Sequence, residues 1–285
     1  MFPNYIIRFS DGSGISFYEI FFAVGLIAAL VLLRVLSDRR GLPAKLQNMV
    51  LIGTVVSCVV GYLSAVLFQA VYDWFATGVF KIDGSTGATF YGGLIGGAAC
   101  FLAIYFGFGH LLFKNEKTHL QYFPAIANIA AVCIPAAHAF GRLGCLSAGC
   151  CSGTPTDAWY GIYMHTADYG YAKVVPLQLF ESIFLFALAG YLFYRNWQRK
   201  GLCLPFYLVG YGIWRFVIEF FRGDDRGATF IPFLSPSQLT AIVLILVGIG
   251  IYIAYFVIIR KKGKTYYDGR PGFVEPQKTQ TEKPE

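Results

Sequence analysis

Long apolar stretches alternate with short polar connectors along almost the whole chain. A helix that crosses a bilayer needs about 20 mostly apolar residues, and seven stretches are long enough. They lie near residues 15–36, 48–74, 89–113, 121–146, 176–194, 202–221 and 236–259. The pattern predicts an all-α integral membrane protein, with a seven-helix membrane domain over residues 1–262.

Two of these stretches contain glycine and polar residues where lipid contact would be unfavourable. The third holds GGLIGG and the fourth holds AAHAFGRLG. Such groups persist at membrane depth when they are buried in protein or line a cavity. A broken or re-entrant helix is therefore an open alternative in both stretches. Residues 263–285, rich in Lys, Thr, Pro and Glu, are predicted to form a disordered tail.

Basic residues concentrate in alternate connectors. These connectors contain Arg34, Arg39, Arg40 and Lys45, then Lys114 and Lys117, then Arg195, Arg199 and Lys200, and finally Arg260, Lys261, Lys262 and Lys264. The positive-inside rule therefore predicts that the N-terminus lies outside and the C-terminal tail is cytoplasmic. A cleaved signal peptide typically has a basic region followed by a short apolar run, and the N-terminal segment lacks this combination. The first stretch is therefore expected to remain a membrane helix.

Composition supports the membrane prediction and excludes an ordinary soluble domain. Hydrophobic residues make up 56% of the 285 residues and charged residues only 14%, against roughly 25% charged in soluble domains. The net charge is +7, but the basic residues form short clusters beside apolar stretches. This placement is typical of residues that orient a membrane protein, and no nucleic-acid partner is expected.

Arg142 and His138 occupy the outer end of the fourth stretch. An Arg at the centre of a membrane helix costs about 2.5 to 3.5 kcal/mol, so each ionisable residue in a span is a candidate functional residue. Arg142 either extends to the lipid headgroups or, between its glycine neighbours, binds a phosphate. His138 lies four residues earlier and shares its helical face. It is either a hydrogen-bonded core residue or a base.

The sixth stretch carries Arg215, Glu219 and Arg222 at spacings of four and three, which places a carboxylate between two guanidinium groups on one face. These charges either neutralise one another as a packing cluster or leave positive charge for an anionic lipid headgroup. Gln178 and Glu181, at the start of the fifth stretch, are in positions typical of a helix cap. Tyrosines in the first, third and sixth stretches are typical of an aromatic belt.

The seven cysteines fall into two groups. Four lie in apolar stretches and are predicted to be small core residues: Cys58, Cys100, Cys133 and Cys203. The other three, Cys145, Cys150 and Cys151, crowd the outer loop as GCLSAGCCSG. A disulfide from Cys145 or simple packing is favoured over catalysis. Zinc is a weaker alternative, because a closed structural site takes four ligands and only three thiols are nearby.

The ordered set of motifs resembles the prolipoprotein diacylglyceryl transferase family. It consists of FYEIFF, a DG before FYGGLIGG, GRLG, PLQLFE and GYGIWRFVIEFFR. The resemblance implies a multi-pass enzyme of the bacterial inner membrane with its active site facing the outer side. It implies transfer of diacylglyceryl from phosphatidylglycerol to the lipobox cysteine thiol of a preprolipoprotein signal peptide, without a cofactor and amid membrane lipids.

Positions within these motifs carry the implied site. By resemblance, the residues matching functional positions of the family are Arg142, Arg215, Glu219, Tyr18, Tyr211, Gln178 and Glu181. Several positions depart from the pattern of the family. Tyr91, Gly92 and Gly93 replace His-Gly-Gly, Cys145 and Cys150 replace Asn and Glu, Val175 and Leu177 replace His and Ser, and the second-span Arg is missing near Gly61 and Tyr62.

The predicted reaction is displacement at a glycerol carbon. A thiol attacks as its thiolate, so the site needs a base, and the departing phosphate needs fixed cations. Arg142 and Arg215 are predicted to bind the phosphate, with Glu219 orienting one of them. His138 or Tyr91 is predicted to move the proton, and His138 is favoured because an imidazole is a better base near neutral pH than a phenol. This scheme requires no metal.

The remaining predictions concern substrate contacts and alternative functions. Substrate binding is assigned to Tyr18, Gly92, Gly93, Gln178, Glu181, Tyr211 and Arg222. One alternative is a related lipid transferase or a thiol-redox protein that uses the three outer cysteines. Another is a lipid-binding protein that has the same bundle and no catalytic turnover.

Overall fold

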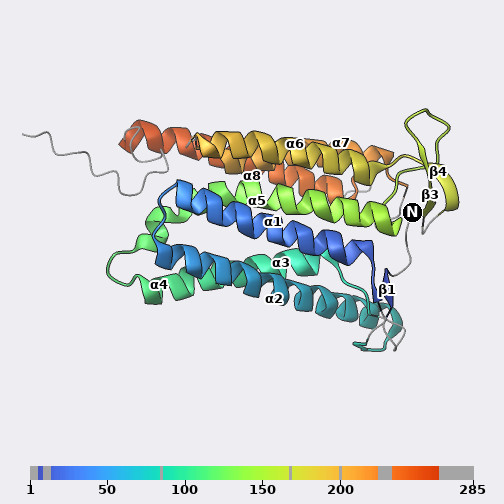
Figure 1. Cartoon of the computed structure of the whole chain (residues 1–285), viewed down its shortest axis with the longest axis horizontal. Coiled ribbons are helices and arrows are strands. Elements are labelled where there is room, and N and C mark those ends of the chain that lie inside the picture. The colour runs from blue at the N-terminus through green and yellow to red at the C-terminus, as the bar shows by residue number, and fades with distance from the viewer. Residues whose placement is uncertain are drawn as a thin grey trace, which may run out of the picture. The chain divides into compact units, whose positions relative to one another are not determined.

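The computed structural model describes residues 6–8, 14–83, 86–166, 169–198, 201–223 and 233–262, with the backbone alone for 258–262 (Figure 1). The predicted tail, residues 263–285, lies outside the described residues. Within them, seven helical segments are long and apolar enough to cross a membrane. The prediction of a helical membrane protein is therefore confirmed.

The spans agree closely with the apolar stretches of the sequence. They are α1 (Phe17–Arg39), α2 (Ala44–Thr77), α3 (Phe90–Leu102) continued by η1 (Ala103–Phe108) and α4 (Gly109–Leu112), α5 (Thr118–Ala148), α6 (Leu177–Trp197), α7 (Cys203–Ile218) continued by η2 (Glu219–Phe221), and α8 (Pro236–Lys262).

The chain divides into two compact units. The first, called unit 1, comprises Met1–Arg40 and Pro124–Glu285, and the second, unit 2, comprises Gly41–Phe123. Unit 1 therefore contains α1, most of α5, and α6, α7 and α8. Unit 2 contains α2, α3, η1, α4 and the first residues of α5. The predicted single membrane domain over residues 1–262 stays a prediction.

Small residues set the packing of unit 2, where α2 and α3 lie side by side (Figure 1). A Cβ on Gly92 would come 2.6 Å from Phe68 Cβ, and a Cβ on Gly96 would overlap the Ser64 side chain. Close approach through small residues is a common way for membrane helices to associate, because lipid provides no hydrophobic drive between them. The glycines of GGLIGG therefore serve a continuous, closely packed helix.

We expect Gly96→Ala to destabilise unit 2 by about 1 to 3 kcal/mol, the usual cost of overpacking a filled interface. Gly107→Ala is the matched control, because no atom lies within 4 Å of a Cβ built there. Thermal unfolding of both variants in detergent measures the difference. Equal unfolding temperatures for the two variants would contradict the close contact between α2 and α3.

The third span is irregular, but not where its glycines suggested. GGLIGG lies within α3, and AAHAFGRLG lies within α5, which also accommodates Pro124 and Pro135. The alternative of a break at these two runs is therefore wrong. The irregularity is the π-helical segment η1. There the buried Tyr105 donates a hydrogen bond of 2.6 Å to the carbonyl oxygen of His119.

In unit 1, α1 packs against α5 through glycine and is fixed to α6 by a polar pair. A Cβ on Gly25 would lie 2.9 Å from the carbonyl oxygen of Ala137. At the other end of α1, the buried Arg40 donates a hydrogen bond of 2.8 Å from Nε to Asn196 Oδ1. Ser182 of α6 also donates to the carbonyl oxygen of Ala139 at 3.0 Å. These contacts fix the helices that carry the candidate site.

Two short hairpins accompany the helices of this mostly helical fold. β1 (Ile7–Arg8) pairs with β2 (Gly14–Ile15), and β3 (Ile162–Thr166) pairs with β4 (Gly170–Val174), both antiparallel. The segment after the outer cysteines is hydrogen-bonded to the residues just before α6 and to the end of η2. Gly153 N–H donates to the carbonyl oxygen of Val175 at 2.9 Å, and Thr154 N–H to that of Phe221 at 3.2 Å. The loop is thereby fixed to the start of α6 and the end of α7.

Candidate active site

Arg142 of α5 and Glu181 of α6 form a two-point ion pair. Arg142 Nε lies 2.8 Å from Glu181 Oε2, and Arg142 Nη2 donates to Glu181 Oε1 at 3.1 Å. The Glu181 side chain is only 1% exposed. A guanidinium held at two points has a fixed plane, so its remaining edge has a defined direction. Glu181 is therefore the counterion of Arg142 rather than a helix cap.

Two further side chains converge on the same carboxylate. Tyr211 of α7 donates a hydrogen bond from its hydroxyl to Glu181 Oε1 at 3.1 Å. His138 Nε2 lies 3.9 Å from Glu181 Oε1, and its ring meets the Tyr211 ring edge to face at 5.3 Å. The predicted common face of His138 and Arg142 is confirmed. Residues from α5 and α7 thus surround the buried carboxylate of α6.

A second charged cluster lies at the end of α7 and the start of α8. Arg215 Nη2 is 2.8 Å from Glu219 Oε2, and Arg222 Nε is 4.0 Å from the same oxygen. Arg215 Nη2 also donates to Ser237 Oγ at 2.7 Å, while Ser235 Oγ donates to Glu219 Oε1 at 2.9 Å. The sequence spacing correctly placed Glu219 between two arginines. It gave no sign of the two serines, which follow a separate connector.

The two clusters act on one another, since Arg215 interacts electrostatically with Glu181. Arg142, Arg215 and Arg222 supply the guanidinium groups of the two clusters, and Glu181 and Glu219 supply the carboxylates. Among the described residues, no atom accepts a hydrogen bond from the buried Arg215 Nη1. An unpaired buried donor is costly. An anionic oxygen would satisfy this donor.

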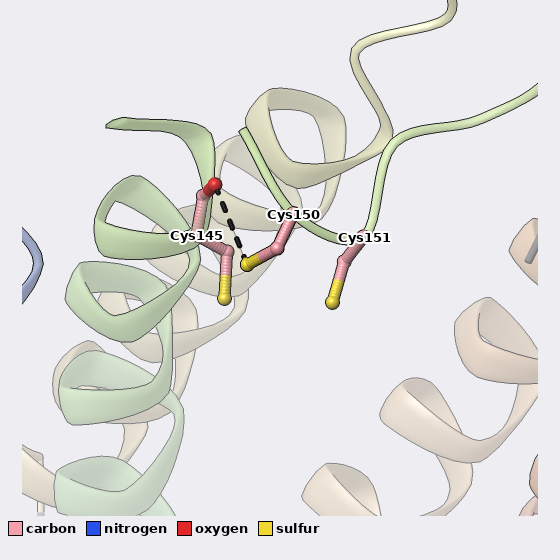
Figure 2. A group of neighbouring side chains, drawn as sticks. All are labelled: Cys145, Cys150 and Cys151. Carbon is pink, nitrogen blue, oxygen red and sulfur yellow. Dashed lines mark hydrogen bonds between the residues drawn. The ribbon is translucent and has the colours of Figure 1, made fainter. Parts of the chain in front are cut away.

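The outer cysteines meet at the end of α5 (Figure 2). The sulfur atoms of Cys145, Cys150 and Cys151 all lie within 4.8 Å of one another. All seven cysteines are among the described residues and none of them is in a disulfide, so the disulfide favoured for Cys145 is not formed. The pKa of the Cys151 thiol is lowered because Cys145 and Cys150 can donate to its sulfur and because Arg222 and Arg142 are nearby.

Gln178 and Tyr18 border this thiol cluster. Gln178 is buried at the start of α6 and donates from Nε2 to the carbonyl oxygen of Cys150 at 2.6 Å. Tyr18, in the first turn of α1, interacts electrostatically with all three thiols. A Cβ on Gly144 would come 3.2 Å from its ring. Both residues thus lie at the edge of the arginine site, and the substrate contacts assigned to them stay predictions.

Tyr91, Gly92 and Gly93 belong to unit 2. The two glycines contact α2: a Cβ on Gly93 would lie 3.4 Å from Ala65 Cβ. Tyr91 is 37% exposed, and its ring meets that of Phe90 edge to face. Packing accounts for the glycines without a substrate. Their assigned substrate role and the catalytic role of Tyr91 stay predictions.

The pairing of Arg142 with Glu181 is the main feature that the sequence interpretation missed. A carboxylate in a nearly uncharged apolar bundle needs a cationic partner, because an unpaired buried charge is strongly destabilising. The sequence interpretation paired Arg215 and Arg222 with Glu219, but it gave Arg142 no acidic partner. Matching each intramembrane acid to such a cation would have identified the pair.

Within the described residues, seven helices are long and apolar enough to span a membrane, and two arginine–carboxylate clusters lie among the helices of unit 1. These features define a multi-spanning membrane protein with a polar site inside its helical part. The chain belongs to the prolipoprotein diacylglyceryl transferase family, because the model of that family matches residues 5–254. The predicted resemblance is confirmed, and the protein is a transferase.

Named relatives match over similar lengths. A phosphatidylglycerol–prolipoprotein diacylglyceryl transferase of Clostridium tetani is 29% identical over 240 residues, which cover 82% of this chain and 91% of the relative. A second transferase of this name, from Clostridium perfringens, is 32% identical over 251 residues, covering 84% and 91%. One from Campylobacter curvus is 31% identical over 268 residues, covering 87% and 91%.

Proposed function

We propose that this protein transfers the diacylglyceryl group of phosphatidylglycerol to the lipobox cysteine thiol of a preprolipoprotein. Family membership and the names of the relatives support this reaction. The observation that carries it is the pair of arginine–carboxylate clusters, in which the buried Arg215 Nη1 has no acceptor among the described residues. That arrangement suits a substrate whose only charge is a phosphodiester embedded in lipid.

The reaction is a displacement at the glycerol carbon that bears the phosphate ester. The acceptor thiolate forms a carbon–sulfur bond as the carbon–oxygen bond to phosphate breaks. The electron pair leaves with the phosphate oxygen, and glycerol phosphate is released. Its phosphate gains negative charge as it departs, so guanidinium groups fixed beforehand lower the barrier. Arg142 and Arg215 serve this purpose, positioned by Glu181 and Glu219 respectively.

The acceptor must lose a proton before it attacks. His138 is the proposed base, because it lies on the same face of α5 as Arg142 and contacts the Tyr211 ring. A positioned base typically contributes 10²- to 10⁴-fold. Tyr91 is the alternative base. Arg222 is proposed to add to the positive field around the phosphate.

The protein is proposed to reside in the bacterial inner membrane, with the N-terminus and the active site on the outer side. Basic connectors on one side of the membrane support this orientation. We expect reporter fusions after Lys117 and after Lys200 to report cytoplasm, and a fusion after Gly153 to report the outside. A fusion after either lysine that reports the outside would overturn the topology.

Incubation of the purified full chain with phosphatidylglycerol and a lipobox peptide tests the reaction. We expect the peptide mass to rise by one diacylglyceryl group, with release of glycerol phosphate. A peptide with serine in place of cysteine and a reaction with phosphatidylethanolamine are the controls. An unmodified cysteine peptide in the presence of folded protein would refute the proposal.

A further inference from the structure

Three thiols from two parts of the chain converge beside the arginine site. Cys145 lies in the last turn of α5, while Cys150 and Cys151 lie in the loop that follows (Figure 2). Their sulfur atoms are within 4.8 Å of one another, and among the described residues no further His, Cys, Asp or Glu joins the group. A disulfide would use two of these sulfurs, whereas a metal ion would use all three.

The spacing suits a thiophilic ion with little rearrangement. Zinc–sulfur bonds are about 2.3 Å long, so the sulfurs of a tetrahedral site lie roughly 3.8 Å apart. The observed separations are at most 4.8 Å, and small rotations of the side chains about their Cα–Cβ bonds close the difference. Thiolates are the ligands that zinc prefers among the common side chains.

The backbone holds the three thiols in this arrangement. The N–H of Cys150 donates to the carbonyl oxygen of Cys145 at 3.2 Å, and Gln178 donates to the carbonyl oxygen of Cys150 at 2.6 Å. Cys151 adopts a left-handed conformation with φ of 62°, which is unusual for a residue with a side chain. The conformation directs its sulfur to the same side as the other two (Figure 2).

Nearby cations balance the charge of such a site. Three thiolates and one Zn²⁺ carry one net negative charge. Arg142 interacts electrostatically with Cys145 and Cys151, and Arg222 with Cys151. The guanidinium groups of Arg142 and Arg222 are thus close enough to the thiols to stabilise negative charge there. An acceptor thiol bound beside the sulfurs and a phosphate bound by the arginines would therefore lie in one site.

We propose that Cys145, Cys150 and Cys151 bind one Zn²⁺ ion, whose fourth coordination position takes the thiol of the acceptor cysteine. This inference rests on the proposed function and deepens it by assigning the means of thiol activation. A zinc site with three protein ligands keeps one position for water or substrate. A thiol that coordinates the ion becomes a thiolate.

The proposed step balances without any redox reagent. The acceptor thiol displaces water from zinc, and its proton passes to the base, proposed above as His138. The zinc-bound sulfur then forms its bond to the glycerol carbon as the carbon–oxygen bond to phosphate breaks. The product is a thioether, which carries no charge and binds zinc weakly. It therefore leaves the ion and restores the three-thiolate site.

Metal analysis of the purified full chain is the first test. We expect one zinc per chain after incubation with Zn²⁺ and removal of the excess. A triple variant should bind zinc at least on the order of 100-fold more weakly. It carries Cys145→Ser, Cys150→Ser and Cys151→Ser. Cys58→Ser with Cys100→Ser is the matched control, because it removes two thiols of unit 2. Equal zinc binding by the triple variant and the control would overturn the site.

Cobalt substitution tests the open coordination position. Co²⁺ in place of Zn²⁺ should give thiolate charge-transfer absorption and the intense visible bands of a tetrahedral site. A lipobox peptide with cysteine should increase the charge-transfer absorption, and the same peptide with serine should leave it unchanged. If the cysteine peptide leaves the spectrum unchanged, the acceptor thiol does not bind the metal and the proposal fails.

These measurements separate this inference from the proposed function, because they need no turnover. Zinc binding and a thiol-dependent cobalt spectrum without diacylglyceryl transfer would support the metal site and refute the function. Full transfer by chelator-treated, metal-free protein would support the function and refute the metal site.

Discussion

Arg142→Lys is expected to lower the rate of diacylglyceryl transfer by on the order of 100-fold or more, while the protein stays membrane-inserted and monodisperse. Lysine keeps the positive charge but lacks the planar fork by which Arg142 holds both oxygens of Glu181. Loss of one fixed donor to developing charge typically costs 10²- to 10³-fold in turnover. The measurement is the rate of peptide modification at equal protein concentration.

Arg215→Lys should behave alike, because Arg215 holds both Glu219 and Ser237. Arg34→Lys is the matched control. Arg34 pairs with Asp38 on an exposed part of α1, where the exchange of one cation for another costs little. Near-normal transfer by both the Arg142 and the Arg215 variants would show that these arginines serve folding rather than phosphate binding.

His138→Gln is expected to reduce transfer far more than Tyr91→Phe, by about 10²- to 10⁴-fold if the imidazole is the base. His138 lies beside the Arg142–Glu181 pair, and an imidazole is a better base near neutral pH than a phenol. A second change, Tyr91→His, should partly rescue the His138→Gln variant, because it supplies an imidazole at the position where the family has one.

All three variants should be compared at equal expression over a range of pH. Loss of transfer in Tyr91→Phe, with normal transfer in His138→Gln, would assign the proton transfer to the tyrosine instead. Glutamine retains hydrogen-bonding capacity at position 138, so a purely structural role for the imidazole would leave transfer largely intact. The unfolding temperature of each variant separates loss of chemistry from loss of fold.

The helical spans were predictable because one physical rule dominates them. Lipid requires an uninterrupted run of apolar residues of nearly fixed length, and α1 through α8 follow those runs within a few residues. The hairpin of β3 and β4 was not predictable in this way. Its residues alternate weakly, and it is held by pairing with neighbouring loops rather than by burial in lipid.

The sequence predicted which residues belong to the candidate site better than it predicted the contacts between them. Helical spacing alone placed Glu219 between Arg215 and Arg222, and His138 on the face of Arg142. The Arg142–Glu181 pair joins residues 39 positions apart, and no local periodicity reports such a contact. The three thiols were recognised as a group, but sequence distance could not show whether their sulfurs were joined, separated or merely adjacent.

The division of the chain into a continuous unit 2 and a discontinuous unit 1 has a consequence for the order of synthesis. α1 is synthesised before the other described spans, but Arg40 at its end donates to Asn196, which is made 156 positions later. Unit 2 is complete at Phe123, so α2 and α3 can associate while much of unit 1 is still to be made. The contacts of α1 within unit 1 form later, and its almost wholly apolar surface is compatible with lipid until then. Because the arginine site lies in unit 1, it forms only after most of the chain has been translated.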